Sequence, residues 1–157
     1  MDSLLESDVQ ELALTRDFNA PVARVFAAWT DPQQAALWWA PQDCTPLSCE
    51  IDLRPGGAWT RRMRVPDSSV ITKHGVFREV VPLQRLAFTY ITDYADGTVD
   101  PETVVMVSFA DLGNGRTRLT LRHVAFQTEL SRSGHEGGWA SALERFAIFC
   151  ASEGGRP

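Results

Sequence analysis

The sequence predicts one α+β domain, in which an antiparallel sheet of about seven strands curves around a long C-terminal helix. The first observation is the order of hydrophobic periods. A repeat of two residues near the N-terminus gives way to a helical repeat, returns from about Leu47 to Val124, and becomes helical again. The second is length, since only the C-terminal helix is long enough to cover the apolar face of such a sheet. The 157 residues contain no internal repeat and no linker, so we expect a single domain with its core at about 9–151.

A strand and two short helices come first. Residues 9–18 alternate between apolar and polar side chains, which is typical of a half-buried strand. Pro21 is suited to the first turn of a helix, and apolar residues follow it with helical spacing. Asp31 and Pro32 are suited to the N-cap and first position of a second short helix, which Pro41 ends.

Six further strands are predicted, separated by short turns. Asn114 and Gly115 supply the positive φ angles of a tight hairpin. Consecutive strands joined by such short links pair antiparallel. The predicted strands are 47–53, 59–65, 70–81, 85–94, 103–111 and 117–124.

The last element is a helix with one apolar stripe. Ser133 and Glu136 have the spacing of a capping box, which predicts the beginning of the helix there. Gly154 and Gly155 end it. The stripe consists of Trp139, Ala142, Leu143, Phe146 and Cys150, while Ser141, Glu144 and Arg145 are expected to face solvent.

One helix cannot fill the concave face of a strongly curved sheet, so the remaining space is either packed by large side chains or left open. Five Trp and eight Phe fit both alternatives. Strand parity places these residues on the concave face: Trp59, Arg61, Met63, Phe77, Glu79, Leu86, Phe88, Tyr90, Val105, Val107, Phe109, Leu119, Leu121 and His123. The candidate ligand-binding residues are Trp38, Trp59, Arg61, Met63, Phe77, Phe88, Tyr90, Val107, Leu121, His123, Trp139, Leu143 and Phe146.

Few polar residues are candidates for chemistry. His123, expected near the pocket mouth, is either a general base or a histidine bonded to backbone near a strand end. Glu79 is a second candidate base. Arg61 needs a partner because an isolated buried charge is costly. That partner is either Glu79 or a carboxylate or phenolate of a ligand.

Composition excludes several other classes. A net charge of −5 and a pI near 5.1 argue against nucleic-acid binding, and Arg61, Arg62 and Arg64 divide between two faces of a strand. Three cysteines without metal-ligand spacing favour a reduced cytoplasmic protein without a metal or cofactor. The polar segment 1–10 does not have the pattern of a signal peptide, and no apolar run predicts a membrane span.

Several short segments, taken in order, resemble a known family. They are Pro21 with Val25, Phe26 and Trp29; 37–41; 55–57; 75–82 with Arg85 and Leu86; 117–121; and Gly138 with Trp139. They are similar to the SRPBCC (START/Bet v 1-like) superfamily, in the branch of the C-terminal domain of the heat-shock-protein-90 ATPase activator. The resemblance spans about 9–151 and implies a helix-grip fold with a deep apolar cavity. Ala40 departs from the usual Trp-Trp-Gly-Pro of this branch.

The first expectation for function is binding of a small hydrophobic molecule between the sheet and the C-terminal helix. One alternative is a cyclase, dehydratase or hydrolase that uses the same pocket, although the sequence contains no catalytic signature. Another is a co-chaperone-like stimulator of a heat-shock ATPase, acting through its surface. A homodimer is also possible.

Overall fold

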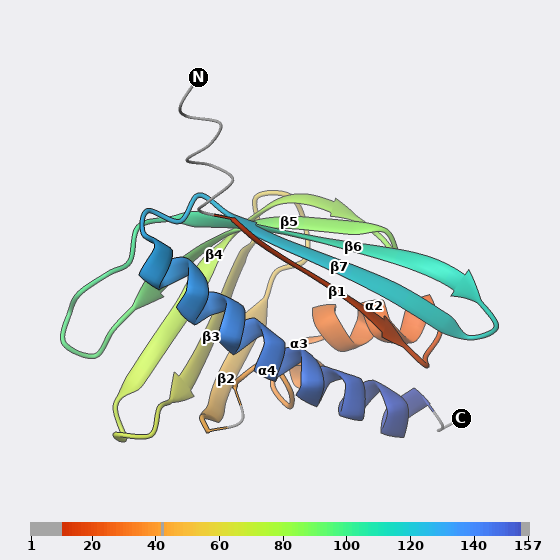
Figure 1. Ribbon diagram of the computed structural model, residues 1–157, viewed down its shortest axis with the longest axis horizontal. Coiled ribbons are helices and arrows are strands. Elements are labelled where there is room, and N and C mark those ends of the chain that lie inside the picture. The colour runs from red at the N-terminus through yellow and green to blue at the C-terminus, as the bar shows by residue number, and fades with distance from the viewer. Residues whose placement is uncertain (1–10, 42, 155–157) are drawn as a thin grey trace.

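The computed structural model describes residues 11–41 and 43–154 and confirms the predicted architecture (Figure 1). One antiparallel sheet contains seven strands in the order β1-β7-β6-β5-β4-β3-β2. The long helix α4 crosses the concave face of the sheet, and the short helices α2 and α3 lie near one end of it (Figure 1). Val9 and Gly155, the predicted ends of the first strand and the last helix, lie outside the described residues.

The observed bounds are close to the predicted ones because turn residues and changes of hydrophobic period mark them. The elements are β1 Leu12–Phe18, α2 Val22–Thr30, α3 Pro32–Ala35, β2 Thr45–Ile51, β3 Ala58–Arg64, β4 Val70–Val81, β5 Arg85–Asp93, β6 Thr103–Gly113, β7 Arg116–Val124 and α4 Glu129–Gly154. Asp31 caps α3 as predicted, since its Oδ1 accepts the backbone N–H of Gln33 at 3.1 Å.

The predicted beginning of α4 was wrong. The helix begins at Glu129, so Ser133 lies inside its second turn. Thr128 precedes the helix, and its Oγ1 accepts a backbone N–H of the first turn at 3.0 Å. Glu136 accepts a hydrogen bond from Arg132 at 2.6 Å and does not complete a capping box. A Ser and a Glu three residues apart therefore occur here on the surface of a continuous helix.

Arg145 on α4 also departs from expectation, because it does not point into solvent. Its Nη1 donates to the backbone oxygens of Ala40 and Pro41, at 3.1 Å each. This irregular loop leaves carbonyl groups without partners in secondary structure, and the arginine satisfies two of them. The hydrogen bonds tie the C-terminal half of α4 to the loop after α3. Glu144 is exposed, as predicted.

The two ends of the concave face are filled differently. Around the C-terminal half of α4, aromatic rings pack closely: the Trp38 and Phe146 centroids are 4.3 Å apart, and those of Trp29 and Trp38 are 4.9 Å apart. Phe18 adds an edge-to-face contact with Phe146 at 5.1 Å. Beneath the N-terminal half of α4 the space remains open. Both alternatives left by the sequence therefore occur in one molecule.

Strand parity predicted the concave face correctly except at Glu79. A β-bulge shifts the pairing between Phe77 and Glu79, so residues from Glu79 onward point to the side opposite to that expected. Glu79 consequently lies on the outer face and pairs with Arg85 at 2.8 Å, and the expected pair with Arg61 does not form. The buried concave residues are Trp59, Arg61, Met63, Phe77, Leu86, Phe88, Tyr90, Val105, Val107, Phe109, Leu119, Leu121 and His123.

Candidate functional site

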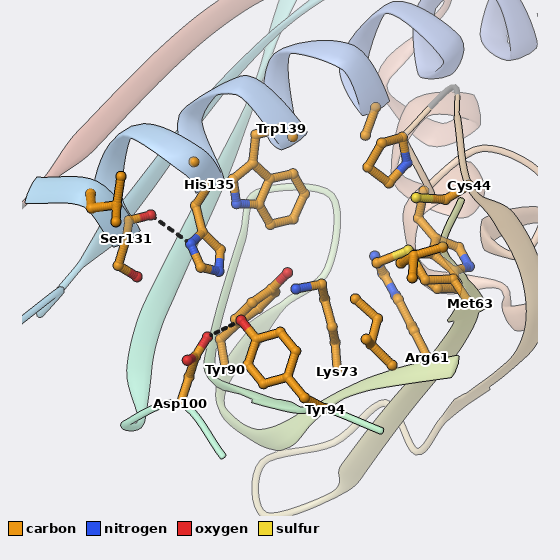
Figure 2. A pocket seen from close by; sticks show the side chains of 18 of the residues that line it. Cys44, Arg61, Met63, Lys73, Tyr90, Tyr94, Asp100, Ser131, His135 and Trp139 are labelled. Carbon is orange, nitrogen blue, oxygen red and sulfur yellow. Dashed lines mark hydrogen bonds between the residues drawn. The ribbon is translucent and has the colours of Figure 1, made fainter. Parts of the chain in front are cut away.

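A cavity of about 460 Å³ lies between the N-terminal half of α4 and strands β3, β4 and β5 (Figure 2). The sheet contributes its floor, and Trp139 and His135 reach into it from the helix. The loops before β2 and after β5 contribute Cys44 and Tyr94 to its sides. Most of the wall is apolar, including Trp39, Met63, Val65, Ile71, Leu130 and Trp139.

Arg61 places a buried cation in this wall. It is 7% exposed, and its guanidinium carbon lies 5.5–5.7 Å from the ring centroids of Trp38, Trp39 and Trp59. These contacts stabilise the charge through cation–π attraction. The Nε–H group is buried without a hydrogen-bond partner among the described residues. Burial lowers the pKa of Arg61, against a small opposing effect of the neighbouring Cys49 thiol.

Lys73 is a second cation in the cavity, and strand-based reasoning missed it. It lies on β4 four residues before Phe77, so both side chains point to the concave face. Its Nζ donates to Thr92 Oγ1 at 3.0 Å and lies 5.2 Å from the Tyr90 ring centroid. Burial lowers the pKa of Lys73 to about 8. The signal that could have found it is strand parity, because Lys73 and Phe77 are four residues apart on one strand.

His123 does not open into the cavity, and the expectation that it lies near the mouth was wrong. Its side chain is completely buried and packs on Phe126. Its Nδ1 accepts the indole N–H of Trp139 at 3.1 Å, so Nε2 carries the proton and donates to Thr103 Oγ1 at 2.7 Å. Thr103 in turn donates to the backbone oxygen of Tyr90 at 2.9 Å. Burial lowers the pKa of His123 to about 2, so the ring is neutral and links three structural elements.

Polar groups line the cavity beside α4 and the loop after β5. His135 donates from Nδ1 to the backbone oxygen of Ser131 at 2.8 Å, which leaves Nε2 as an acceptor in the neutral ring. Burial lowers the pKa of His135. Tyr94 donates its hydroxyl to Asp100 at 2.7 Å, and burial raises the pKa of this tyrosine to about 12. A smaller cavity of about 210 Å³ adjoins this side.

The candidate ligand-binding residues divide between this cavity and the core. Arg61, Met63, Tyr90 and Trp139 line the cavity. Trp39, and not its neighbour Trp38, belongs to the wall. The other candidates are buried in the core: Trp38, Trp59, Phe77, Phe88, Val107, Leu121, His123, Leu143 and Phe146. Strand parity predicts which face of the sheet a side chain occupies. It does not predict which half of that face is filled by α4 and aromatic rings and which half stays open.

The polar groups of the site include the Arg61 guanidinium, the Lys73 amine and several hydroxyl groups. Within residues 11–41 and 43–154, no group of three or more His, Cys, Asp or Glu side chains could hold a metal ion. None of the helices in these ranges has the length and apolarity needed to cross a membrane. The chemistry that this arrangement supports is binding of an apolar molecule with an acceptor or anionic group near Arg61 and Lys73.

A curved antiparallel sheet around a C-terminal helix, with an internal cavity, defines a helix-grip protein of the SRPBCC superfamily. Residues 19–150 match the family model described as "Activator of Hsp90 ATPase homolog 1-like protein", and the chain belongs to that family.

Solved structures agree with this assignment. The AHSA1 protein from Silicibacter pomeroyi is 26% identical, with a TM-score of 0.81 over 91% of this chain and 99% of that one. A protein from Nitrosomonas europaea is 25% identical, with a TM-score of 0.77 over 92% and 96%. A protein from Mycobacterium smegmatis is 26% identical, with a TM-score of 0.75 over 90% of each chain. No curated protein matches the chain.

Proposed function

We propose that this protein binds a small, largely apolar molecule in the cavity beneath the N-terminal half of α4. The observation that carries the proposal is the open volume of about 460 Å³ in a chain whose remaining concave face is tightly filled by aromatic rings. Cavities of this size and apolar character are typical of small-molecule sites. The family supports the same reading, since its fold commonly encloses hydrophobic ligands.

The first experiment is mass spectrometry of the freshly purified protein under native and denaturing conditions. A non-covalent mass that is present only under native conditions would identify a bound molecule and its chemical class. The neutral dye N-phenyl-1-naphthylamine gives a second readout, because its fluorescence rises in apolar surroundings. We expect the dye to bind and to be displaced by the native ligand. A protein without bound mass that also fails to bind the dye would contradict the proposal.

An enzymatic use of the same cavity would require different residues from those the sequence suggested. His123 is enclosed with both ring nitrogens bonded, and Glu79 lies on the outer face of the sheet. The titratable groups that line the cavity are Cys44, Arg61, Lys73, Tyr90, Tyr94, Asp100 and His135. A Lys73 pKa of about 8 is the one property here that favours acid–base chemistry at neutral pH. Turnover of the co-purified molecule, lost in Lys73→Met, would support this second candidate.

A further inference from the structure

A buried cation and a partly buried one lie side by side on the floor of the cavity. Arg61 on β3 pairs directly with Lys73 on β4. Side chains in such a pair lie on the same face of a sheet, and here both line the cavity (Figure 2). Like charges in this position repel each other, and partial burial weakens the screening by water. An anionic group bound between the two side chains would therefore be favoured.

Neither cation has a carboxylate partner. None of the ion pairs formed by the described residues includes Arg61 or Lys73. The Nε–H group of Arg61, a side chain that is 7% exposed, has no hydrogen-bond acceptor there. The Lys73 ammonium has three protons, and the acceptor recorded for it is the neutral hydroxyl of Thr92. The tryptophan rings around Arg61 attract its charge but supply no oxygen atoms.

The acidic group in the cavity wall is engaged elsewhere. Asp100 accepts the Tyr94 hydroxyl at 2.7 Å and makes no ion pair with Lys73 in the described part of the chain. Its negative charge acts on Lys73 only at longer range. The titratable groups around Lys73 are Arg61 on β3, Cys44 before β2, Tyr90 on β5, Tyr94 and Asp100 after β5, His123 on β7 and His135 on α4.

We propose that the cavity takes an apolar molecule that carries a carboxylate, and that Arg61 and Lys73 bind this carboxylate between them. This inference rests on the proposed function and names the chemical class of its ligand. The carboxylate oxygens would accept from the guanidinium and ammonium groups in charge-assisted hydrogen bonds and would offset the repulsion between the two cations. The apolar part would lie against Met63, Ile71 and Trp139. The other cationic side chains of the sequence are all arginines, so the cavity holds its only lysine.

The test compares 1-naphthylacetate with 1-naphthylacetamide, which share a ring system and differ in charge. Binding is measured by isothermal titration calorimetry at pH 7. We expect the acid to bind at least roughly tenfold more tightly, which is the scale of one charge-assisted hydrogen bond. Arg61→Met and Lys73→Met should each abolish most of this preference, because each change weakens binding of the acid more than binding of the neutral amide. Arg62→Met is the matched control, because Arg62 lies on the same strand but is exposed.

The outcomes separate this inference from the proposed function. Equal affinity for the acid and the amide would overturn the carboxylate site and leave apolar binding standing. An equal loss of preference in Arg62→Met would assign the effect to surface charge and would also overturn it. If neither compound nor the neutral dye binds, the proposed function itself fails.

The pH dependence gives an independent readout of Lys73. Because burial lowers its pKa to about 8, the amine loses its charge as the pH rises from 7 to about 9.5. The preference for the acid over the amide should fall across that range, since the carboxylate remains ionised throughout. Lys73→Met should show no such fall. A flat profile in the unaltered protein would remove Lys73 from the site.

Discussion

Arg61 and His123 are both buried titratable side chains, but the structure accommodates them in different ways. His123 loses its charge and becomes the centre of a hydrogen-bond chain through Trp139 and Thr103. A guanidinium does not deprotonate in proteins, so Arg61 retains its charge among the tryptophan rings. The histidine is therefore satisfied within the protein, whereas the arginine still has a donor to offer.

Replacement of Arg61 tests whether its charge has a structural partner. We expect Arg61→Met to keep the free energy of unfolding within about 1 kcal/mol of the unaltered protein, because no buried carboxylate loses its counter-ion. The lost cation–π contacts are offset by removal of an unpaired buried charge. Urea denaturation followed by circular dichroism measures the change. A loss of about 3–5 kcal/mol would instead indicate a broken buried ion pair.

The buried neutral state of His123 makes stability depend on pH. The folded pKa is about 2, below the value of 6.5 for a free histidine, so the unfolded chain binds a proton that the folded chain does not. Stability is therefore fully present above pH 6.5 and is lost as the pH falls, by about 1.4 kcal/mol per pH unit. Urea titrations at pH 7, 6 and 5 measure this slope. His123→Gln should have a shallower slope, and an unchanged slope would contradict the assignment.

At the scale of elements, Gly75 allows the backbone of β4 to pack directly against Thr89 of β5. A Cβ atom there would clash with the backbone oxygen of Thr89, which also accepts the indole N–H of Trp59 at 3.0 Å. Only glycine fits beside this backbone group. The junction fixes β3, β4 and β5 relative to one another, and these three strands form the floor of the cavity.

Substitution of glycine by alanine should therefore have opposite effects on stability at Gly75 in the sheet and at Gly137 in α4. We expect Gly75→Ala to destabilise the protein by about 2 kcal/mol or more, because the clash involves backbone atoms that cannot rotate away. Gly137→Ala is the matched control, since its Cβ would meet no atom within 4 Å on an exposed turn of α4. It should gain up to about 1 kcal/mol from helix propensity. Chemical denaturation measures both, and equal effects would contradict the close approach.

The sequence predicted the elements well because periods and turn residues are local signals. It could not predict the bulge after Phe77, since nothing local to that segment distinguishes a regular strand from a bulged one. The bulge moved Glu79 to the outer face, where it pairs with Arg85, so the pair expected with Arg61 does not form. The position of the cavity depends on which aromatic rings fill the opposite end of the concave face. Trp38 belongs to that filled end, whereas its neighbour Trp39 lies in the cavity wall.

On the scale of the whole molecule, occupancy of the cavity should be visible as stability. A ligand that binds only the folded state stabilises it by about 2.7 kcal/mol at a concentration one hundred times its dissociation constant. We expect 1-naphthylacetate to raise the melting temperature by several degrees in differential scanning fluorimetry. Arg61→Met and Lys73→Met should show a smaller rise at the same concentration. The native mass measurement described above also tests the homodimer, because it gives the mass of the assembly.

The N-terminal half of α4, which covers the cavity, is rich in glycine. Gly134, Gly137 and Gly138 lie within two turns of α4, and a glycine inside a helix costs about 1 kcal/mol relative to alanine. The following turns are secured by Leu143 and Phe146, which are almost completely buried. Brief unwinding of α4 should therefore start above the cavity, and the amide hydrogens of its first turns should exchange with solvent soonest. A ligand would enter through that local opening, while the part of the molecule packed by aromatic rings stays folded.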